Sequence, residues 1–385
     1  MFNGLKLKQV RELHNLTVEY LAEQLESNAK FFRNVEAGFM QPPIEIVNDL
    51  AEFFFVQPDF FYAASFLEDS VDEEAIFFDR DDWKLRTKTK AQLRRVQFVD
   101  AIINRAAAGL VFPKFTIDEL RKYALNQYLL GTSIATIAET VREKLKIQQN
   151  YELLQALEIA GIRVLDYKTD TEIKPYSLWT DNGTAYIAFG NALYAQVDRN
   201  FVLAQQLGHL LLHQGIDMNT ISAQDFRDLT HEAIEFAYEL LLPTEEFVKT
   251  FNKAIKDPTH LVEYLPIREH FQVSVKNIQR RALILEMYEP DVAGKLMTEL
   301  RREKWERREP GDDTDMIYLA GRNISILTGL FRMSPMTLAM FLKEFQIKLE
   351  FLQSLFGTKM EYLEDLENPA VKPDGKPKQT YMHLL

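Results

Sequence analysis

The sequence contains no cysteine among its 385 residues. This absence excludes disulfide bonds, thiolate metal sites and cysteine nucleophiles, so a metal ion would need histidine and carboxylate ligands. It also fits a reducing compartment. No apolar run approaches the roughly 20 residues of a membrane-spanning helix, and the opening MFNGLKLKQV lacks the apolar segment of a signal peptide. We therefore expect a soluble cytoplasmic protein that does not bind membranes.

Positive charge is also scarce. The chain has 45 Lys and Arg against 57 Asp and Glu, which gives a formal net charge of -12. Because affinity for phosphates depends largely on Lys and Arg, this balance argues against indiscriminate binding of nucleic acid. Any contact with DNA must be local. The length predicts two or three domains rather than one core.

Changes in composition divide the chain into segments. An acidic stretch, LEDSVDEEAIFFDRDD, meets the basic WKLRTKTKAQLRR, which is typical of a connector. The strand-like segments IRVLDY, YSLWT and TAYIAFG stand among helical ones, and Asp181-Asn182-Gly183 predicts a hairpin turn between the last two. The expected fold is mainly α with a small α+β domain. We expect an N-terminal helical domain at 1–66, a charged connector and helix at 67–112, a mixed domain with a short β-sheet at 113–290, a C-terminal helical domain at 291–366 and a disordered tail at 367–385.

The first segment resembles the Cro/CI-type (XRE) helix-turn-helix domain. The resemblance covers LKQVRELHNLTVEYLAEQLESNAKFFRNVEAGFMQPPIEIVNDLAEFFFV. Thr17 is placed to cap a helix that buries Leu21 and Leu25, and Ser27 or Asn28 to cap the next helix, which buries Phe32 and Val35. The resemblance implies a five-helix domain whose second capped helix enters the major groove. The expected DNA-binding residues are Thr17, Asn28, Lys30, Phe31, Arg33 and Asn34.

Two features depart from this pattern. Val18 stands where the family often has a glutamine that contacts phosphate, and carboxylates outnumber basic residues in the segment. The alternative is a helical dimerisation or docking module that has kept the fold without binding DNA. The aromatic clusters Phe53-Phe54-Phe55 and Phe60-Phe61-Tyr62 exceed what so small a domain can bury alone. We expect them to pack against following helices or a second subunit, and packing in the domain's own core is the alternative.

Residues 201–215 read FVLAQQLGHLLLHQG. With TIAETVREKL, ELLQALEIAGIRVLDY and EAIEFAYELLLP, they resemble the ImmA/IrrE (M78-like) family of metallopeptidase-like domains in order and spacing. In active members the helix reads A-H-E-L-G-H-L-L-L-H, in which the two histidines bind zinc and the glutamate is the general base. Here Gln205-Gln206-Leu207-Gly208-His209 replaces H-E-x-x-H. We therefore expect no catalytic residue, no bound metal and no other cofactor.

The third ligand of the family is an acid on the following helix. In this chain it is either missing at Thr230 or kept at Glu232. His209 and His213 form an i, i+4 pair that could hold a metal. A histidine at the position of His213 is common in the family, however, and it packs or caps a helix more often than it binds metal. An emptied metal cleft would leave a concave pocket formed by Gln205, Gln206, His209 and Glu232, suited to a small ligand, a peptide or a protein partner.

These features predict a cytoplasmic transcriptional repressor. It would bind a double-stranded DNA operator as a homodimer and receive a signal at the pseudo-active site. Such pairings resemble regulators of prophages and mobile elements. One alternative is a zinc metallopeptidase with an atypical site that cleaves a partner repressor. Another is an antitoxin-like or anti-repressor protein that acts only through protein contacts.

Overall fold

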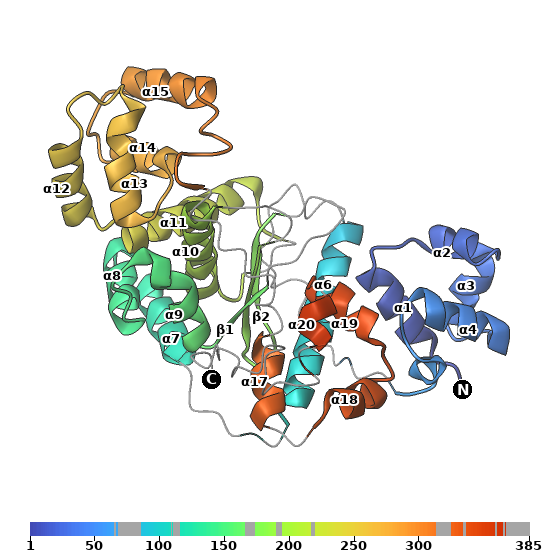
Figure 1. The fold of residues 1–385 in the computed structure, drawn as a ribbon. Helices are drawn as coiled ribbons and strands as arrows, with labels where there is room; N and C mark the ends of the chain where they lie inside the picture. Colours follow the sequence, from blue (N-terminus) through green and yellow to red (C-terminus); the bar gives the residue numbers. More distant parts are fainter. Residues whose placement is uncertain are drawn as a thin grey trace.

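The computed structural model describes most of the chain and confirms a mainly helical fold with one small sheet (Figure 1). The structure describes residues 1–64, 67, 86–108, 110, 116–165, 174–189, 195–216, 220–312, 325–333, 336–358, 360–364 and 366. The acidic stretch of the connector and the tail at 367–385 lie outside these residues, and the predicted domain boundaries remain a prediction. Within the described part of the chain, no helix has the length and apolar character that a membrane crossing requires.

The N-terminal bundle follows the predicted pattern of caps. Thr17 Oγ1 accepts a hydrogen bond from the backbone N–H of Tyr20 at 3.1 Å, and Asn28 Oδ1 accepts one from Phe31 at 2.8 Å. These caps start the second and third helices at the expected residues. In place of five α-helices the bundle has four and a short 3₁₀ helix, namely α1 (Gly4–Leu13), α2 (Val18–Gln24), α3 (Ala29–Glu36), α4 (Ile44–Phe53) and η1 (Pro58–Phe61).

Helix α6 (Arg86–Ala106) joins the bundle to the rest of the molecule. Helix α1 packs along it. Arg94 Nε lies 2.8 Å from Glu12 Oε2, and the guanidinium of Arg95 donates to the carbonyl oxygens of Ser354 and Leu355. Arg94 and Arg95 end the predicted basic stretch, and both are used in packing rather than on a solvated surface.

The C-terminal helices complete the core of the bundle. Leu330, Phe341 and Leu352 are buried in the same cluster as the bundle and α6. Val56 and Ile347 form an isolated antiparallel bridge, and the backbone N–H of Lys348 donates to the carbonyl oxygen of Phe55 at 3.0 Å. The helices are α17 (Ser325–Met333), α18 (Leu338–Phe345), α19 (Leu349–Phe356) and α20 (Met360–Glu364).

The aromatic clusters of the N-terminal segment meet these helices as expected. The ring of Phe60 lies 6.5 Å from that of Phe351 in α19, which also stacks edge-on against Phe98 of α6 at 5.6 Å. Phe54 and Phe61 are also buried, whereas Phe55 and Tyr62 stay exposed. Phe60 thus meets the following helices, whereas Phe61 stacks on Phe2 and Phe54 lies beside His14 within the bundle itself.

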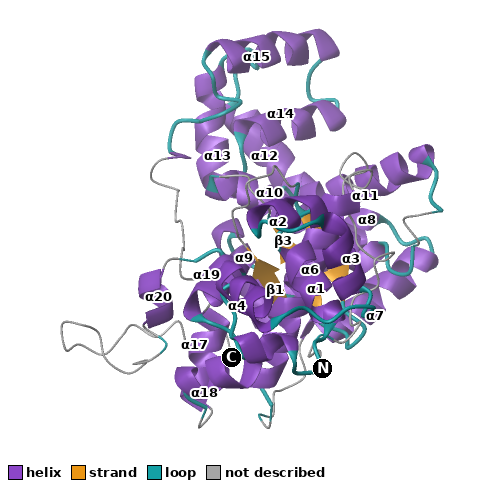
Figure 2. Ribbon diagram, turned by 90° about the vertical axis from the view of Figure 1, so that its right-hand side faces the viewer, coloured by secondary structure: helices purple, strands orange, loops and turns teal. Residues whose placement is uncertain are grey.

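A three-stranded sheet separates two hydrophobic cores. Strand β3 (Ala185–Ala188) lies in the middle, parallel to β1 (Ile162–Leu165) and antiparallel to β2 (Tyr176–Trp179). The predicted hairpin is confirmed, since Gly183 has φ 83° and its N–H donates to Thr180 O at 2.8 Å. One face of the sheet packs with α6, the bundle and the C-terminal helices, and the other packs with the core that contains α10 and α11. In Figure 2 the bundle and α6 lie in front of the strands.

The second core carries the segment with the altered motif. Helices α10 (Gln196–Leu212) and α11 (Ala223–Leu241) pack closely at Gly208, which has no side chain. A Cβ added at this position would lie only 3.2 Å from the Cα of Ala233. The other elements around this core are α7 (Thr116–Leu129), α8 (Ile134–Lys144), η3 (Asn150–Glu152), α9 (Leu153–Ile159), α12 (Thr244–Ala254), η4 (Leu261–Tyr264), α13 (Leu265–Phe271), α14 (Val275–Ile284) and α15 (Pro290–Arg302).

Replacement of Gly4 by alanine should destabilise the N-terminal bundle. A Cβ at this position would lie 2.0 Å from the carbonyl oxygen of Val35, so α1 would have to move away from α3. We expect Gly4→Ala to lower the free energy of unfolding by about 1–3 kcal/mol in urea titrations. Gly294→Ala is the matched control, because its Cβ would meet nothing within 4 Å. That change should be neutral or stabilise α15 by up to ~1 kcal/mol. Equal effects at the two positions would contradict the close approach of α1 and α3.

Candidate functional site

One face of α10 carries a row of polar side chains that the protein interior covers. Gln206, His209 and His213 are buried, while Gln205 is half-buried. These residues recur at three- and four-residue spacing, which places them on one side of the helix. Gln206 Oε1 has no hydrogen-bond partner among the described residues. A buried oxygen without a hydrogen-bond partner lowers the stability of the fold. Gln206 is therefore not explained by packing alone.

The two histidines belong to a chain of hydrogen bonds that crosses from α10 to α11 and α7. His209 Nδ1 lies 3.0 Å from His213 Nδ1, and His213 Nε2 lies 3.0 Å from Glu232 Oε2. The hydroxyl of Tyr128 donates to the same carboxylate oxygen at 2.7 Å. Tyr128 also packs edge-on against the ring of His213. This series of hydrogen bonds therefore leads from the buried imidazole of His209 to the partly exposed carboxylate of Glu232.

The electrostatics favour neutral imidazoles. Burial lowers the pKa of His209 well below 6.5, and the neighbouring His213 lowers it further. Burial also lowers the pKa of His213, although Glu232 opposes this shift. With both rings neutral, one arrangement of protons satisfies the contacts: His213 donates from Nε2 to Glu232, and His209 donates from Nδ1 to His213. Burial, followed by the bond to Glu232, raises the pKa of Tyr128 to about 12.

This geometry does not suit a zinc ion. Both ring nitrogens of His213 and Nδ1 of His209 are used within the chain. A zinc site instead needs three or four ligand atoms that converge on one point at roughly 2.0–2.3 Å. In the part of the chain that the structure describes, no three His, Asp or Glu side chains are arranged to hold a metal. The position of the first histidine is Gln205, whose amide is a poor zinc ligand.

The structure also distinguishes the two candidate acid positions. Thr230 Oγ1 donates to Phe226 O of its own helix at 2.8 Å, whereas Glu232 reaches across to His213. The structure thus brings together His209 and Glu232, with His213 between them, while Gln205 and Gln206 lie along the same helix. Sequence reasoning missed Tyr128, because a lone tyrosine in a helical stretch carries no motif. The sequence predicts that His213 packs or caps, and His213 is indeed buried at the C-cap of α10, where it also links His209 to Glu232.

The predicted DNA-reading residues lie on the surface of the N-terminal bundle. Thr17, Asn28, Lys30 and Arg33 are exposed, and Phe31 and Asn34 are half-buried. In Figure 1, α2 and α3 lie on the side of the bundle away from the sheet and α6. The outward face of α3 is therefore open, whereas Phe32 and Val35 fill the core behind it.

Ion pairs set the position and the charge of α3. Arg11 of α1 forms two hydrogen bonds with Glu36, at 2.6 and 2.8 Å, in a largely buried pair that fixes the C-terminal end of α3. Arg33 pairs with Glu19 of α2, and both side chains are more than half exposed. Exposed pairs of this kind contribute little to stability, so Arg33 can exchange Glu19 for another anion at small cost.

One part of the chain matches a known protein family. Residues 157–283 match the IrrE N-terminal-like domain family, Peptidase_M78. This segment runs from α9 to α14 and includes both helices that carry the histidines and Glu232. The match does not extend to the N-terminal bundle. No curated protein matches the chain.

Removal of the His209 imidazole should weaken the pH dependence of stability. The folded-state pKa of His209 lies below its unfolded value of 6.5. The folded state therefore binds fewer protons, and stability is lost as the pH falls through about 6.5, by ~1.4 kcal/mol per pH unit for each such histidine. Burial lowers the pKa of His14 to about 4, so some dependence will remain.

The measurement is urea unfolding at about pH 7.5 and about pH 5.5. His209→Gln should lose less stability between these conditions than the unmodified protein. His231→Gln is the control, because His231 is exposed on α11, and it should behave like the unmodified protein. A His209→Gln variant with unchanged pH dependence would show that the buried imidazole does not stay neutral.

Proposed function

We propose that this chain is a DNA-binding transcriptional regulator, a repressor, in which a non-catalytic IrrE N-terminal-like domain receives a signal. The observation that carries the proposal is the open face of α3, with capped α2 and α3 in the order of a helix-turn-helix unit. In such units the second helix enters the major groove. The protein would act in the cytoplasm.

The chemistry of α3 suits a weak but specific contact. Lys30 and Arg33 supply positive charge, and Asn28 lies at the N-terminal end of the helix, where backbone N–H groups favour phosphates. The chain is acidic overall, so one bundle would bind DNA poorly. A homodimer on an inverted repeat presents two such helices and doubles the contacts.

The residues of α10 support a domain without catalytic activity. Hydrolysis by an H-E-x-x-H site needs a carboxylate to take a proton from metal-bound water. Gln206 occupies that position, and an amide cannot serve as a base. His213, a possible replacement ligand, is bound to His209 and Glu232. These observations support a role in binding rather than in cleavage.

The same residues are the proposed receiving site for the signal. Gln205 and Glu232 are partly exposed to solvent, and Gln206 and His209 are buried. Gln206 Oε1 has no partner among the described residues, and a peptide or small ligand would bind at the accessible side chains of Gln205 and Glu232.

A second candidate function is suggested by exposed apolar residues beside α3. Phe39 is 85% exposed, and Tyr20, Met40 and Ile44 are each more than 40% exposed. Apolar groups of this size on one small bundle are typical of a protein-binding surface. The alternative is an antitoxin-like or anti-repressor protein that docks a protein partner here instead of DNA.

Selection of DNA fragments from a random pool by the purified protein separates these functions. We expect enrichment of a short inverted repeat whose half-sites lie about one helical turn apart. Lys30→Ala with Arg33→Ala should weaken binding by ~1–3 kcal/mol for each residue that contacts a base edge, and should lower the dependence on salt.

The control carries Lys249→Ala and Lys253→Ala, which remove the same charge from exposed positions on α12. It should bind like the unmodified protein. Failure to enrich any sequence would favour the docking function. Equal losses in both double variants would mean that only overall charge matters.

The zinc content of the purified protein tests whether the IrrE N-terminal-like domain is non-catalytic. The purified protein should contain no stoichiometric zinc and should not hydrolyse peptides. Gln205→His with Gln206→Glu restores the H-E-x-x-H spacing with His209, and this double variant should take up zinc in elemental analysis. About one zinc per unmodified chain, lost on His209→Ala, would instead support an atypical peptidase.

A further inference from the structure

Residues 309–312, which we call the clasp, follow α15 and fold back onto α13 and α14. These three helices lie together at one end of the molecule (Figure 1). Gly311 has φ 98°, and a Cβ added there would lie 2.9 Å from Arg268 Nη1, so the clasp passes close to this guanidinium. The next described helix, α17, belongs to the core of the N-terminal bundle. The clasp is therefore the last described segment of the chain before the bundle core.

Two buried carboxylates hold the clasp to one arginine. Arg268 Nε donates to Glu309 Oε2 at 2.9 Å, and Arg268 Nη2 donates to Asp312 Oδ1 at 2.6 Å. Glu309 Oε2 also accepts a bond from the backbone N–H of Val275, the first residue of α14, at 3.0 Å. The side chains of Arg268, Glu309 and Asp312 are at most 9% exposed. Polar contacts from which water is largely excluded therefore keep the clasp in place.

A third carboxylate faces these groups from the first turn of α10. Asp198 accepts a hydrogen bond from the side chain of Ser274, and its negative charge acts on Glu309. Lys276 of α14 also acts on Asp198, but this lysine is only half-buried. Three carboxylates thus surround a single buried arginine. This arrangement leaves an excess of negative charge where hydration is poor.

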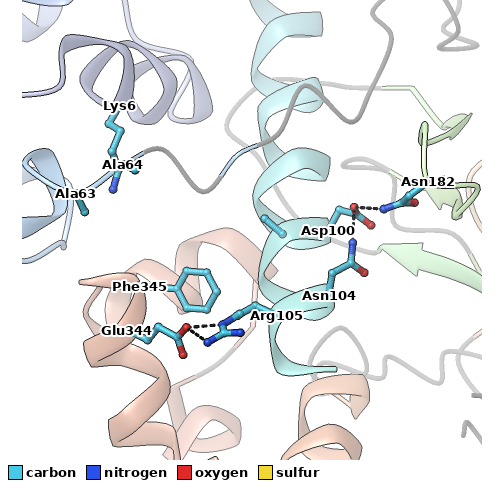
Figure 3. A pocket seen from close by; sticks show the side chains of 10 residues that line it. Lys6, Ala63, Ala64, Asp100, Asn104, Arg105, Asn182, Glu344 and Phe345 are labelled. Carbon is cyan, nitrogen blue, oxygen red and sulfur yellow. Dashed lines mark hydrogen bonds and ion pairs between the residues drawn. The ribbon is translucent and has the colours of Figure 1, made fainter. Parts of the chain in front are cut away.

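The buried carboxylate of Asp100 shows a different balance. Its Oδ1 accepts bonds from Arg163 and Tyr186. Its Oδ2 accepts bonds from the amides of Asn104 and Asn182 (Figure 3). One carboxylate there meets one guanidinium and three neutral donors, so no proton is needed. A buried carboxylate without enough opposite charge instead favours its protonated form. We therefore expect one carboxyl group around Arg268 to hold a proton near neutral pH.

Glu309 is the carboxyl group that holds this proton. Burial raises the pKa of Glu309 to about 7, and the charges of Asp198 and Asp312 act in the same direction. The bond from Val275 and the charge of Arg268 oppose this shift without cancelling it. Away from these groups, the carboxyl would have its ordinary pKa of 4.5. The closed clasp therefore binds a proton that an open clasp releases.

We propose that residues 309–312 are a proton-controlled clasp, which stays closed on α13 and α14 while Glu309 is protonated and opens as the pH rises through neutrality. Because the closed form has the higher proton affinity, closure is favoured fully below pH 4.5, and this advantage is lost as the pH rises through about 7. Opening detaches the chain at the point where it leaves the second core. This regulation goes beyond the proposed function, because it does not depend on what the bundle binds.

The test is hydrogen exchange of the full chain without DNA, measured by mass spectrometry at about pH 6 and about pH 8 and corrected for the intrinsic exchange rate at each pH. Between these conditions, a carboxyl group with a pKa of about 7 changes the closure equilibrium by about tenfold. We expect the protection of peptides covering 272–278 and 305–312 to fall about tenfold at the higher pH. The protection of residues 203–210, in the core of α10, should stay constant.

Glu309→Gln keeps an acceptor oxygen but cannot ionise, so the clasp should be protected equally at both pH values. Asp198→Asn removes a facing negative charge from α10 and should reduce the pH dependence. Two control variants should behave like the unmodified protein. Glu303→Gln removes an exposed carboxylate at the end of α15. His270→Gln removes the histidine of α13, which is exposed and bonds to Glu246 instead.

Two results would overturn the proposal. One is protection of the clasp in the unmodified protein that is equal at both pH values, or higher at the higher pH. The other is a Glu309→Gln variant that keeps the full dependence on pH. If this variant does not fold, an unchanged pH dependence in Asp198→Asn leads to the same rejection.

Discussion

The buried carboxylate of Asp100 is the contact on which the arrangement of the two halves depends. It comes from α6, which carries the N-terminal bundle, and it accepts bonds from Arg163 of β1, Tyr186 of β3 and the turn at Asn182. A buried charge without partners would be costly, so its satisfaction requires α6 and the sheet to meet at one register. The sheet in turn positions α10 on its other face. Asp100 therefore helps to fix how α6 and the attached bundle sit on the sheet.

Helix α10 has an apolar face and a polar face with different surroundings. Leu203, Leu207 and Leu210 fill the core, and Gly208 allows α11 to approach closely. On the polar face, the histidines bond to each other and to Glu232. The packing of the helix therefore depends on the apolar face, whereas any chemistry at this site would depend on the polar one.

Much of the local structure could be predicted from the sequence, since its causes are local. Thr17 and Asn28 mark helix starts through their own side chains, and Asp181-Asn182-Gly183 marks a turn through the freedom of glycine at positive φ. Contacts between distant segments could not be predicted in this way. The pairing of Phe60 with Phe351 depends on tertiary packing, and the bond from Tyr128 to Glu232 joins residues without a shared motif.

The bridge between Val56 and Ile347 has a consequence for biosynthesis. The N-terminal bundle leaves the ribosome first, but helices near the C-terminus supply part of its core. At translation rates of about 5–20 residues per second, the partner strand segment follows roughly 15–60 s later. During that interval the apolar edge of the bundle is uncovered. A nascent chain of this protein therefore exposes a surface that chaperones can bind, and the bundle becomes fully packed only after the helices between residues 325 and 364 have been synthesised.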